Sequence, residues 1–397
     1  MQRSINVEPD VKVPARLSRR GAIAPFVVMD IMRAANERRQ SGHDIVHMEV
    51  GQPGTPAPLL ARQAIKAAVD RDLLGYTEAL GMPRLRERIA QLYRDAHGLD
   101  ISPERVVVTA GSSAAFVLAF LALFDEGARI VLPQPGYPCY RNIVKALGLV
   151  PVELPVGPPE RWMPAARLLA AEHDGDAAPA GLLFASPANP TGTMMSEAAL
   201  AQICAACRAQ GIVLIADEIY HGLTYAGPAR TALAFDDGVI VVNSFSKYYS
   251  MTGWRVGWMV VPQNLVRGIE RLAQNFYISP AAVSQIGALA AFDAIEELEA
   301  NKAVYAANRE LLLDELPRAG FGKLAPADGA FYLYADVSEM TDDSVAFSRR
   351  VLHEAGVAVT PGIDFDPARG HRFLRFSYSG TTKDMAEAAK RLRAWRR

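Results

Sequence analysis

A chain of 397 residues is long enough for two domains, or for one large α/β domain with an appendage. Half of its residues are hydrophobic, 21% are charged and the formal net charge is −1, so the strongly basic surface that nucleic acids or anionic lipids require is excluded. No stretch approaches the roughly 18 apolar residues that cross a bilayer, and residues 1–20 lack an apolar signal core. We therefore expect small-molecule partners, with no nucleic acid or membrane, and a cytoplasmic location.

Residues 1–18 contain two prolines and mixed charges without periodicity, which predicts an N-terminal arm. From about residue 100, short β-branched segments alternate with helical segments. This alternation predicts an α/β fold with a mostly parallel sheet covered by helices on both faces. The expected strands are residues 105–110, 129–132, 181–185, 212–216, 239–243 and 258–261, and the expected helices include 113–124 and 196–210.

The pattern changes after about residue 285. A long helical stretch through residue 316 precedes a segment at 329–337, a helix near 344–355 and short strands at 357–360 and 372–377. These elements indicate a second, smaller α+β domain. We predict a large domain of residues 50–289 and a small domain formed by residues 19–49 and 290–397.

The cysteines and histidines give no support for a metal or redox centre. Cys204 and Cys207 form a C-x-x-C pair, a spacing found in redox and metal sites but also on one face of a helix. Both lie in an alanine-rich helical segment, and no second pair completes a zinc site. The seven histidines show no metal-ligand spacing, so we expect buried helical thiols and no metal.

Signatures of other enzyme classes are absent or incomplete. Neither G-x-G-x-x-G after a strand nor G-x-x-x-x-G-K-[ST] occurs, so a dinucleotide or nucleoside triphosphate site has no support. Ser244 and Lys247 match the S-x-x-K motif of penicillin-recognising acyltransferases. They follow a predicted strand rather than open a helix, and no K-T-G accompanies them. We therefore do not expect serine acyl transfer.

Polar residues follow several of the predicted strands at the point where each strand ends. Ligands of open α/β sheets bind at the carboxyl ends of the strands, so these residues are expected to line one crevice. They are Gly111-Ser112-Ser113, Pro135-Gly136-Tyr137, Asn189-Pro190-Thr191-Gly192, Asp217-Glu218-Ile219-Tyr220 and Ser244-Phe245-Ser246-Lys247.

The chemistry of this crevice suits an anion and a charged ring. Ser112 and Ser113 at a helix N-terminus form an anion site, to which Arg255 could add a bidentate charge. Asp217 ends a very apolar strand, so a cationic partner is expected, and a pyridinium nitrogen would fit.

The remaining side chains suit the rest of such a ring. Tyr137 could stack on it, Asn189 and Tyr220 could hydrogen-bond a phenolate oxygen, and the Lys247 amine could condense with an aldehyde.

Together these residues resemble the class I aminotransferases of the aspartate aminotransferase superfamily, which depend on pyridoxal 5'-phosphate (PLP). The resemblance extends over nearly the whole chain in the family's order, which makes the set specific. It rests on Gly51-Gln52-Pro53-Gly54, residues 76–86, Asn189-Pro190-Thr191-Gly192, Asp217-Glu218-Ile219-Tyr220, residues 244–255 and Arg375-Phe376-Ser377-Tyr378. It implies the PLP-dependent transferase fold of type I.

The resemblance also implies the role of each residue. Lys247 should hold PLP as a Schiff base and move the proton, Asp217 should keep the pyridine nitrogen protonated, and Tyr220 should bind the ring oxygen. The implied cofactor-binding residues are Tyr76, Ser112, Ser113, Tyr137, Asn189, Asp217, Tyr220, Ser244, Lys247 and Arg255, and the implied substrate-binding residues are Gly51, Asn189 and Arg375.

By the same resemblance, Tyr76 should reach the cofactor of a second subunit, which implies a homodimer with shared active sites. The implied reaction is ping-pong transfer of an amino group between an amino acid and a 2-oxo acid. Gln52 replaces the acidic residue usual at this position, and no residue is assignable as a receptor for a second substrate carboxylate.

Two alternatives share the cofactor residues. The first is a lyase on the same fold, either a C–S β-lyase or an enzyme similar to aminocyclopropanecarboxylate synthase. The second is an effector-binding regulator, but the roughly 20 residues before the fold cannot hold a DNA-binding module.

Overall fold

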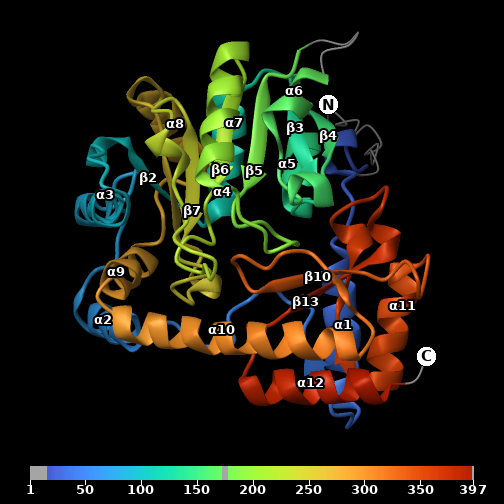
Figure 1. Ribbon diagram of the computed structural model, residues 1–397. Helices are drawn as coiled ribbons and strands as arrows, with labels where there is room; N and C mark the ends of the chain where they lie inside the picture. The colour runs from blue at the N-terminus through green and yellow to red at the C-terminus, as the bar shows by residue number, and fades with distance from the viewer. Residues whose placement is uncertain (1–15, 172–177, 396–397) are drawn as a thin grey trace, which may run out of the picture.

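The computed structural model describes residues 16–171 and 178–395 (Figure 1). Residues 1–15 of the predicted N-terminal arm lie outside the described residues. In the described part of the chain, no helix is both long enough and apolar enough to cross a membrane.

A seven-stranded sheet forms the upper half of the molecule in Figure 1. Only β8 runs antiparallel to its neighbours, so the expectation of a mostly parallel sheet is confirmed. In spatial order the strands are β2 (Val106–Thr109), β8 (Gly257–Val260), β7 (Ile240–Ser244), β6 (Val213–Asp217), β5 (Gly181–Ala185), β3 (Arg129–Gln134) and β4 (Val150–Pro155).

The six predicted strands are all present, but β4 was not predicted. It lies at the sheet edge, contains Pro151 and Pro155, and exposes alternate residues. Prolines are tolerated at such an edge because part of the backbone has no strand partner there, yet in a sequence they indicate a turn.

Helices cover both faces of this sheet because successive strand residues point to opposite sides. Leu182 and Val241 belong to one apolar core, while Leu183 and Val242 belong to the other. The first core includes residues of α2 (Leu59–Arg71), α3 (Pro83–His97), α7 (Glu197–Gln210) and α9 (Ala282–Ala291), and the second includes residues of α4 (Ser112–Leu123), α5 (Pro138–Ala146) and α8 (Gln263–Phe276).

Cys204 and Cys207 lie on the buried face of α7, each 1% exposed, which confirms their interpretation as core residues. No cluster of metal-ligating side chains occurs among the residues that the structure describes.

A second, antiparallel sheet lies below the first in Figure 1, with α10 running beneath it. Its strands in order are β12 (Thr360–Pro361), β13 (Phe373–Ser377), β10 (Tyr332–Asp336) and β9 (Lys323–Leu324). The helices of this part are α1 (Val27–Gln40), α10 (Ile295–Arg318), α11 (Ser344–Arg350) and α12 (Thr382–Ala394).

The early residues fold with the C-terminal part, because β1 (Val46–His47) pairs in parallel with β11 (Val357–Ala358). The long helical stretch expected after residue 285 is two helices, since α9 ends at Ala291 and α10 begins at Ile295. The division into domains at residues 50 and 289 stays a prediction.

The two sheets meet at the carboxyl end of β6. Tyr220 and Leu223, which follow that strand, share an apolar core with Tyr332 of β10 and with Phe331 just before it. A bridge between Thr224 and Gly329 also joins the two parts. The polar strand ends of the first sheet therefore face the second sheet.

Candidate active site

A cavity of about 250 Å³ lies where the two sheets meet. All but two of the site residues predicted from the sequence line it. They are Gly51, Ser112, Ser113, Tyr137, Asn189, Asp217, Tyr220, Lys247, Arg255 and Arg375.

The two predicted residues outside the cavity are Ser244 and Tyr76. The Ser244 hydroxyl is buried, lies 2.9 Å from the Ser246 hydroxyl and donates to the Val256 carbonyl at 3.0 Å, so that Ser246 lines the cavity instead. Tyr76 follows α2 and is 84% exposed. The phosphate contacts expected for Ser244 and Tyr76 stay predictions.

Asp217 is a buried carboxylate at the end of β6. One oxygen accepts the hydroxyl proton of Tyr140, and the other accepts the Ile219 amide at 3.0 Å. No ion pair joins Asp217 to a cation among the described residues. Burial raises the pKa of Asp217 to about 6, although both hydrogen bonds and the charge of Lys247 act to lower it. A cation beside this carboxylate would therefore be strongly favoured.

Lys247 follows β7 and extends its amine into the cavity. Its Nζ donates to the Gly51 carbonyl at 2.5 Å. Removal from water lowers the pKa of Lys247 to about 8, and the charges of Arg375 and Arg255 act in the same direction. More of this amine is therefore neutral near pH 7 than of an exposed lysine, which makes it a better nucleophile.

An anion-binding cradle forms at the N-terminus of α4. The helix begins at Ser112, directly after Gly111, whose φ of 77° is in the left-handed region. A Cβ atom at Gly111 would push against the Arg255 guanidinium, and the left-handed backbone itself favours glycine at this position. Arg255 donates to the Thr252 carbonyl at 3.0 Å and has no ion-pair partner among the described residues. Two hydroxyls, helix amides and a guanidinium together suit a phosphate.

Arg375 is a buried cation on β13 of the second sheet. Its guanidinium donates to the Asn189 side chain at 2.8 Å and to the Glu49 carbonyl at 2.5 Å. It lies between the rings of Tyr332 and Phe365, at 4.4 and 4.8 Å from their centres. No carboxylate pairs with it in the described part of the chain, and its Nε has no hydrogen-bond partner there.

The start of α1 closes one side of the cavity. Phe26, Val28 and Met29 line it, and the Phe26 ring stacks near Tyr137 at 6.0 Å between centres. Asp364 accepts the amides of Val27 and Val28, each at 3.1 Å, and so caps this helix.

This constellation of amine, carboxylate, anion cradle and arginine has counterparts in known proteins. A family model for class I and II aminotransferases matches residues 43–392. The chain belongs to this family. It is a PLP-dependent aminotransferase, which exchanges an amino group between an amino acid and a 2-oxo acid.

Relatives match the aminotransferase over almost their whole length. The valine–pyruvate aminotransferase of Mycobacterium tuberculosis is 49% identical over 384 residues, which cover 96% of this chain and 98% of that protein.

Solved structures agree with this match. The crystal structure of an aminotransferase from Mycobacterium tuberculosis is 49% identical, covers 96% of this chain and 99% of that chain, and has a TM-score of 0.93. The aspartate aminotransferase from Thermus thermophilus with maleate is 30% identical, covers 96% and 100% of the two chains, and has a TM-score of 0.89. The expected fold of type I is confirmed.

Several cavity residues of the aminotransferase were not predicted. Tyr140 lies three residues after Tyr137 on α5, and this helical spacing, which brings two side chains to one face, was the available signal. Tyr332 and the residues at the start of α1 gave no local signal, because only the tertiary fold brings them to the cavity.

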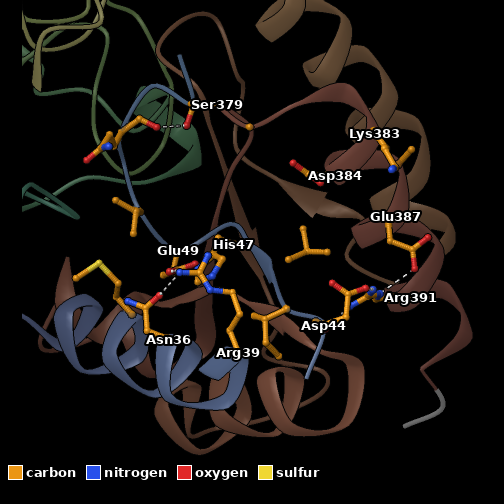
Figure 2. Close-up of a pocket in the computed structure, with 18 of the residues that line it drawn as sticks. Asn36, Arg39, Asp44, His47, Glu49, Ser379, Lys383, Asp384, Glu387 and Arg391 are labelled. Carbon is orange, nitrogen blue, oxygen red and sulfur yellow. Dashed lines mark hydrogen bonds and ion pairs between the residues drawn. The ribbon is translucent and has the colours of Figure 1, made fainter. Parts of the chain in front are cut away.

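A larger groove of about 950 Å³ is lined by residues of α1, by residues between 44 and 54, and by residues of α12 (Figure 2). In it His47 contacts the Glu49 carboxylate at 2.8 Å, and Arg391 pairs with Asp44 and Glu387. Gln52 lines this groove and not the cavity. The groove lacks Lys247, Asp217 and Arg375 and is therefore not the reaction centre of the aminotransferase.

Proposed function

We propose that the cavity binds PLP and that the enzyme transfers the amino group of an amino acid with an apolar side chain to a small 2-oxo acid such as pyruvate. The observation that carries this proposal is the charge pattern of the cavity. Asp217 needs a cation, the α4 cradle needs an anion, and Arg375 needs a carboxylate.

The residues fit PLP on three sides. Asp217 would bind the protonated ring nitrogen, Lys247 would bond to the aldehyde carbon, and Arg255 with the start of α4 would hold the phosphate. Tyr137 would stack on the ring, and Tyr220 with Asn189 would bind the ring oxygen. When bound, PLP supplies an electron sink for the charge that develops at the substrate Cα.

Each protein group then has a definite task. Arg375 pairs with the α-carboxylate of the substrate and so fixes the Cα–H bond near Lys247. The Lys247 nitrogen takes the Cα proton and later returns one, a role for which an amine held inside the cavity is well placed. Asp217 keeps a proton on the ring nitrogen by direct charge attraction. The amino acid and the oxo acid use these groups in turn, which is a ping-pong cycle.

The apolar part of the cavity supports the substrate class. Besides the polar groups, the lining consists of Phe26, Val28, Met29, Val50 and Ile219. The lining cations are Lys247, Arg255 and Arg375, to which the amine, phosphate and α-carboxylate roles are assigned. A second substrate carboxylate would therefore be desolvated without a partner. The name of the 49% identical valine–pyruvate aminotransferase agrees with this choice.

We also propose a cytoplasmic homodimer in which Tyr76 reaches the phosphate of the partner's cofactor. Leu73 is 96% exposed and Tyr76 is 84% exposed, and Phe276 and Ile278 are also more than half exposed. So many exposed large apolar side chains are typical of an interface. The three free thiols fit a reducing compartment.

Two measurements on the purified enzyme test the proposal. Borohydride reduction followed by mass spectrometry should place PLP on Lys247 alone. With pyruvate as acceptor, kcat/KM for valine should exceed that for aspartate by about a hundredfold, the effect of roughly 3 kcal/mol from an unpaired polar group. PLP on another lysine would refute the assigned cofactor site. Equal use of valine and aspartate would refute the substrate class alone.

A further inference from the structure

Tyr332 lies at the junction of three groups that have separate tasks. It is fully buried at the start of β10. Its hydroxyl lies 2.7 Å from the hydroxyl of Tyr220, and its ring lies 4.4 Å from the guanidinium carbon of Arg375. The same hydroxyl packs against the Cα of Gly51, where a Cβ atom would collide with it.

We propose that Tyr332 is a positioning residue for transamination, whose hydroxyl directs the Tyr220 proton toward the cofactor and whose ring holds the substrate-binding Arg375. This inference rests on the proposed function, because it assumes that Tyr220 serves the ring oxygen of PLP.

The direction of the hydrogen bond between the two phenols follows from the role proposed for Tyr220. Each hydroxyl has one proton to donate. Within the described part of the chain, the Tyr332 hydroxyl has Tyr220 as its hydrogen-bond partner and no other. Either hydroxyl could donate in this contact when Tyr220 has no other partner. If Tyr220 gives its single proton to the ring oxygen of PLP, only Tyr332 can donate between the two phenols, and its hydroxyl then holds the Tyr220 proton toward the cavity.

A phenol that accepts one hydrogen bond becomes a stronger donor in the next. Tyr332 should therefore strengthen the bond from Tyr220 to the ring oxygen. With PLP bound, that hydrogen bond would withdraw negative charge from the ring oxygen and make the titrating proton of the bound cofactor easier to remove. Loss of the Tyr332 hydroxyl should therefore raise the pH at which bound PLP loses this proton.

The ring of Tyr332 has a different task from its hydroxyl. The faces of Tyr332 and Phe365 both lie against the Arg375 guanidinium, and the face of an aromatic ring attracts a cation. Phenylalanine at position 332 would keep this contact and lose only the hydroxyl. Leucine would lose both.

The experiment compares Tyr332→Phe and Tyr332→Leu with Tyr334→Phe in the PLP-loaded enzyme. Tyr334 is a matched control, because it is a buried tyrosine of the same strand whose hydroxyl has no hydrogen-bond partner among the described residues. The first measurement is the pH midpoint of the visible absorbance of bound PLP. The second is the affinity for isovalerate, which carries the carboxylate and side chain of valine but no amino group.

We expect Tyr332→Phe to move the absorbance midpoint to higher pH, by less than Tyr220→Phe does, and to bind isovalerate within about twofold of the wild type. The kcat/KM of Tyr332→Phe should fall by roughly three- to tenfold, the usual effect of one neutral hydrogen bond. Tyr332→Leu should in addition bind isovalerate about five- to tenfold more weakly, the range expected for a desolvated cation over a ring. Tyr334→Phe should change neither quantity.

An unshifted midpoint in Tyr332→Phe, or a shift equal to that of Tyr334→Phe, would overturn the role of the hydroxyl. Isovalerate binding weakened equally in Tyr332→Phe and Tyr332→Leu would overturn the role of the ring. If the wild type carries PLP on Lys247 and either of these contradicting outcomes is found, only the inference about Tyr332 fails. If the wild type carries no PLP on Lys247, the proposed function fails as well.

Discussion

The two sheets contribute to one cavity in different ways. The seven-stranded sheet supplies Asp217 as the last residue of β6 and Lys247 from the loop after β7, and the start of α4 closely follows β2. The second sheet supplies Arg375 and Tyr332 from within its strands. A functional residue after a strand is visible as a local motif, whereas a residue within a buried strand looks like part of the core.

The two sheets give the cavity a side for the cofactor, around Asp217, and a side for the substrate, around Arg375, and the charges of these two sides are complementary. The cofactor side holds a buried carboxylate without a cation, and the substrate side holds a buried guanidinium without a carboxylate. Each arrangement costs folding free energy that a bound ligand would offset. This comparison predicts that damage to the cofactor side slows the chemical step, while damage to the substrate side weakens substrate binding.

The largest effect is expected for Asp217→Asn. The amide keeps the shape of the carboxylate but not the charge that holds a proton on the ring nitrogen. If that pair contributes about 3 to 5 kcal/mol, single-turnover transamination should slow by roughly a hundredfold to several thousandfold, while PLP still binds. Rapid mixing with valine, followed by absorbance, measures this rate.

A PLP analogue methylated at the ring nitrogen provides the control for Asp217. It carries the positive charge permanently, so it should restore part of the lost rate in Asp217→Ala. A variant that reacts at the wild-type rate, or an analogue that binds without restoring activity, would remove Asp217 from its assigned role.

On the substrate side, Arg375→Ala should weaken amino acid binding and leave PLP in place. Loss of a buried charge pair costs about 2 kcal/mol or more, so kcat/KM should fall by at least roughly thirtyfold. Steady-state kinetics with valine and the absorbance of bound PLP measure the two effects. Loss of PLP together with substrate affinity would break the division between the two sides.

The smallest effect concerns the pH dependence of PLP uptake. Only the neutral Lys247 amine attacks an aldehyde, and its pKa is lowered to about 8. Uptake by the apo-protein should therefore rise with pH, reach half of its maximal rate near pH 8 and level off about one pH unit higher. Asp217 acts to raise this pKa, so Asp217→Asn should shift the rise to lower pH. Stopped-flow absorbance measures uptake, and a rise centred near the ordinary value for lysine would contradict the predicted shift.

Much of the cofactor side could be predicted from the sequence, because alternating strands and helices place strand ends together. Tyr140 was not predicted as a site residue, because its hydrogen bond to Asp217 joins residues that are far apart in the chain. Ser244 and Ser246 could not be told apart, since a difference of two residues decides which hydroxyl faces the cavity. Arg375 was found through its motif alone, because nothing local distinguishes an arginine on a buried strand.

The capping of α1 by Asp364 suggests how the substrate specificity of this enzyme could change during evolution. Asp364 holds the helix by accepting hydrogen bonds from the backbone amides of Val27 and Val28, and these bonds do not depend on the side chains at the two positions. Phe26, Val28 and Met29 can therefore be exchanged while the helix stays attached in the same place. New substrate preferences could arise from substitutions at these three positions, without a change in the groups that perform the chemistry.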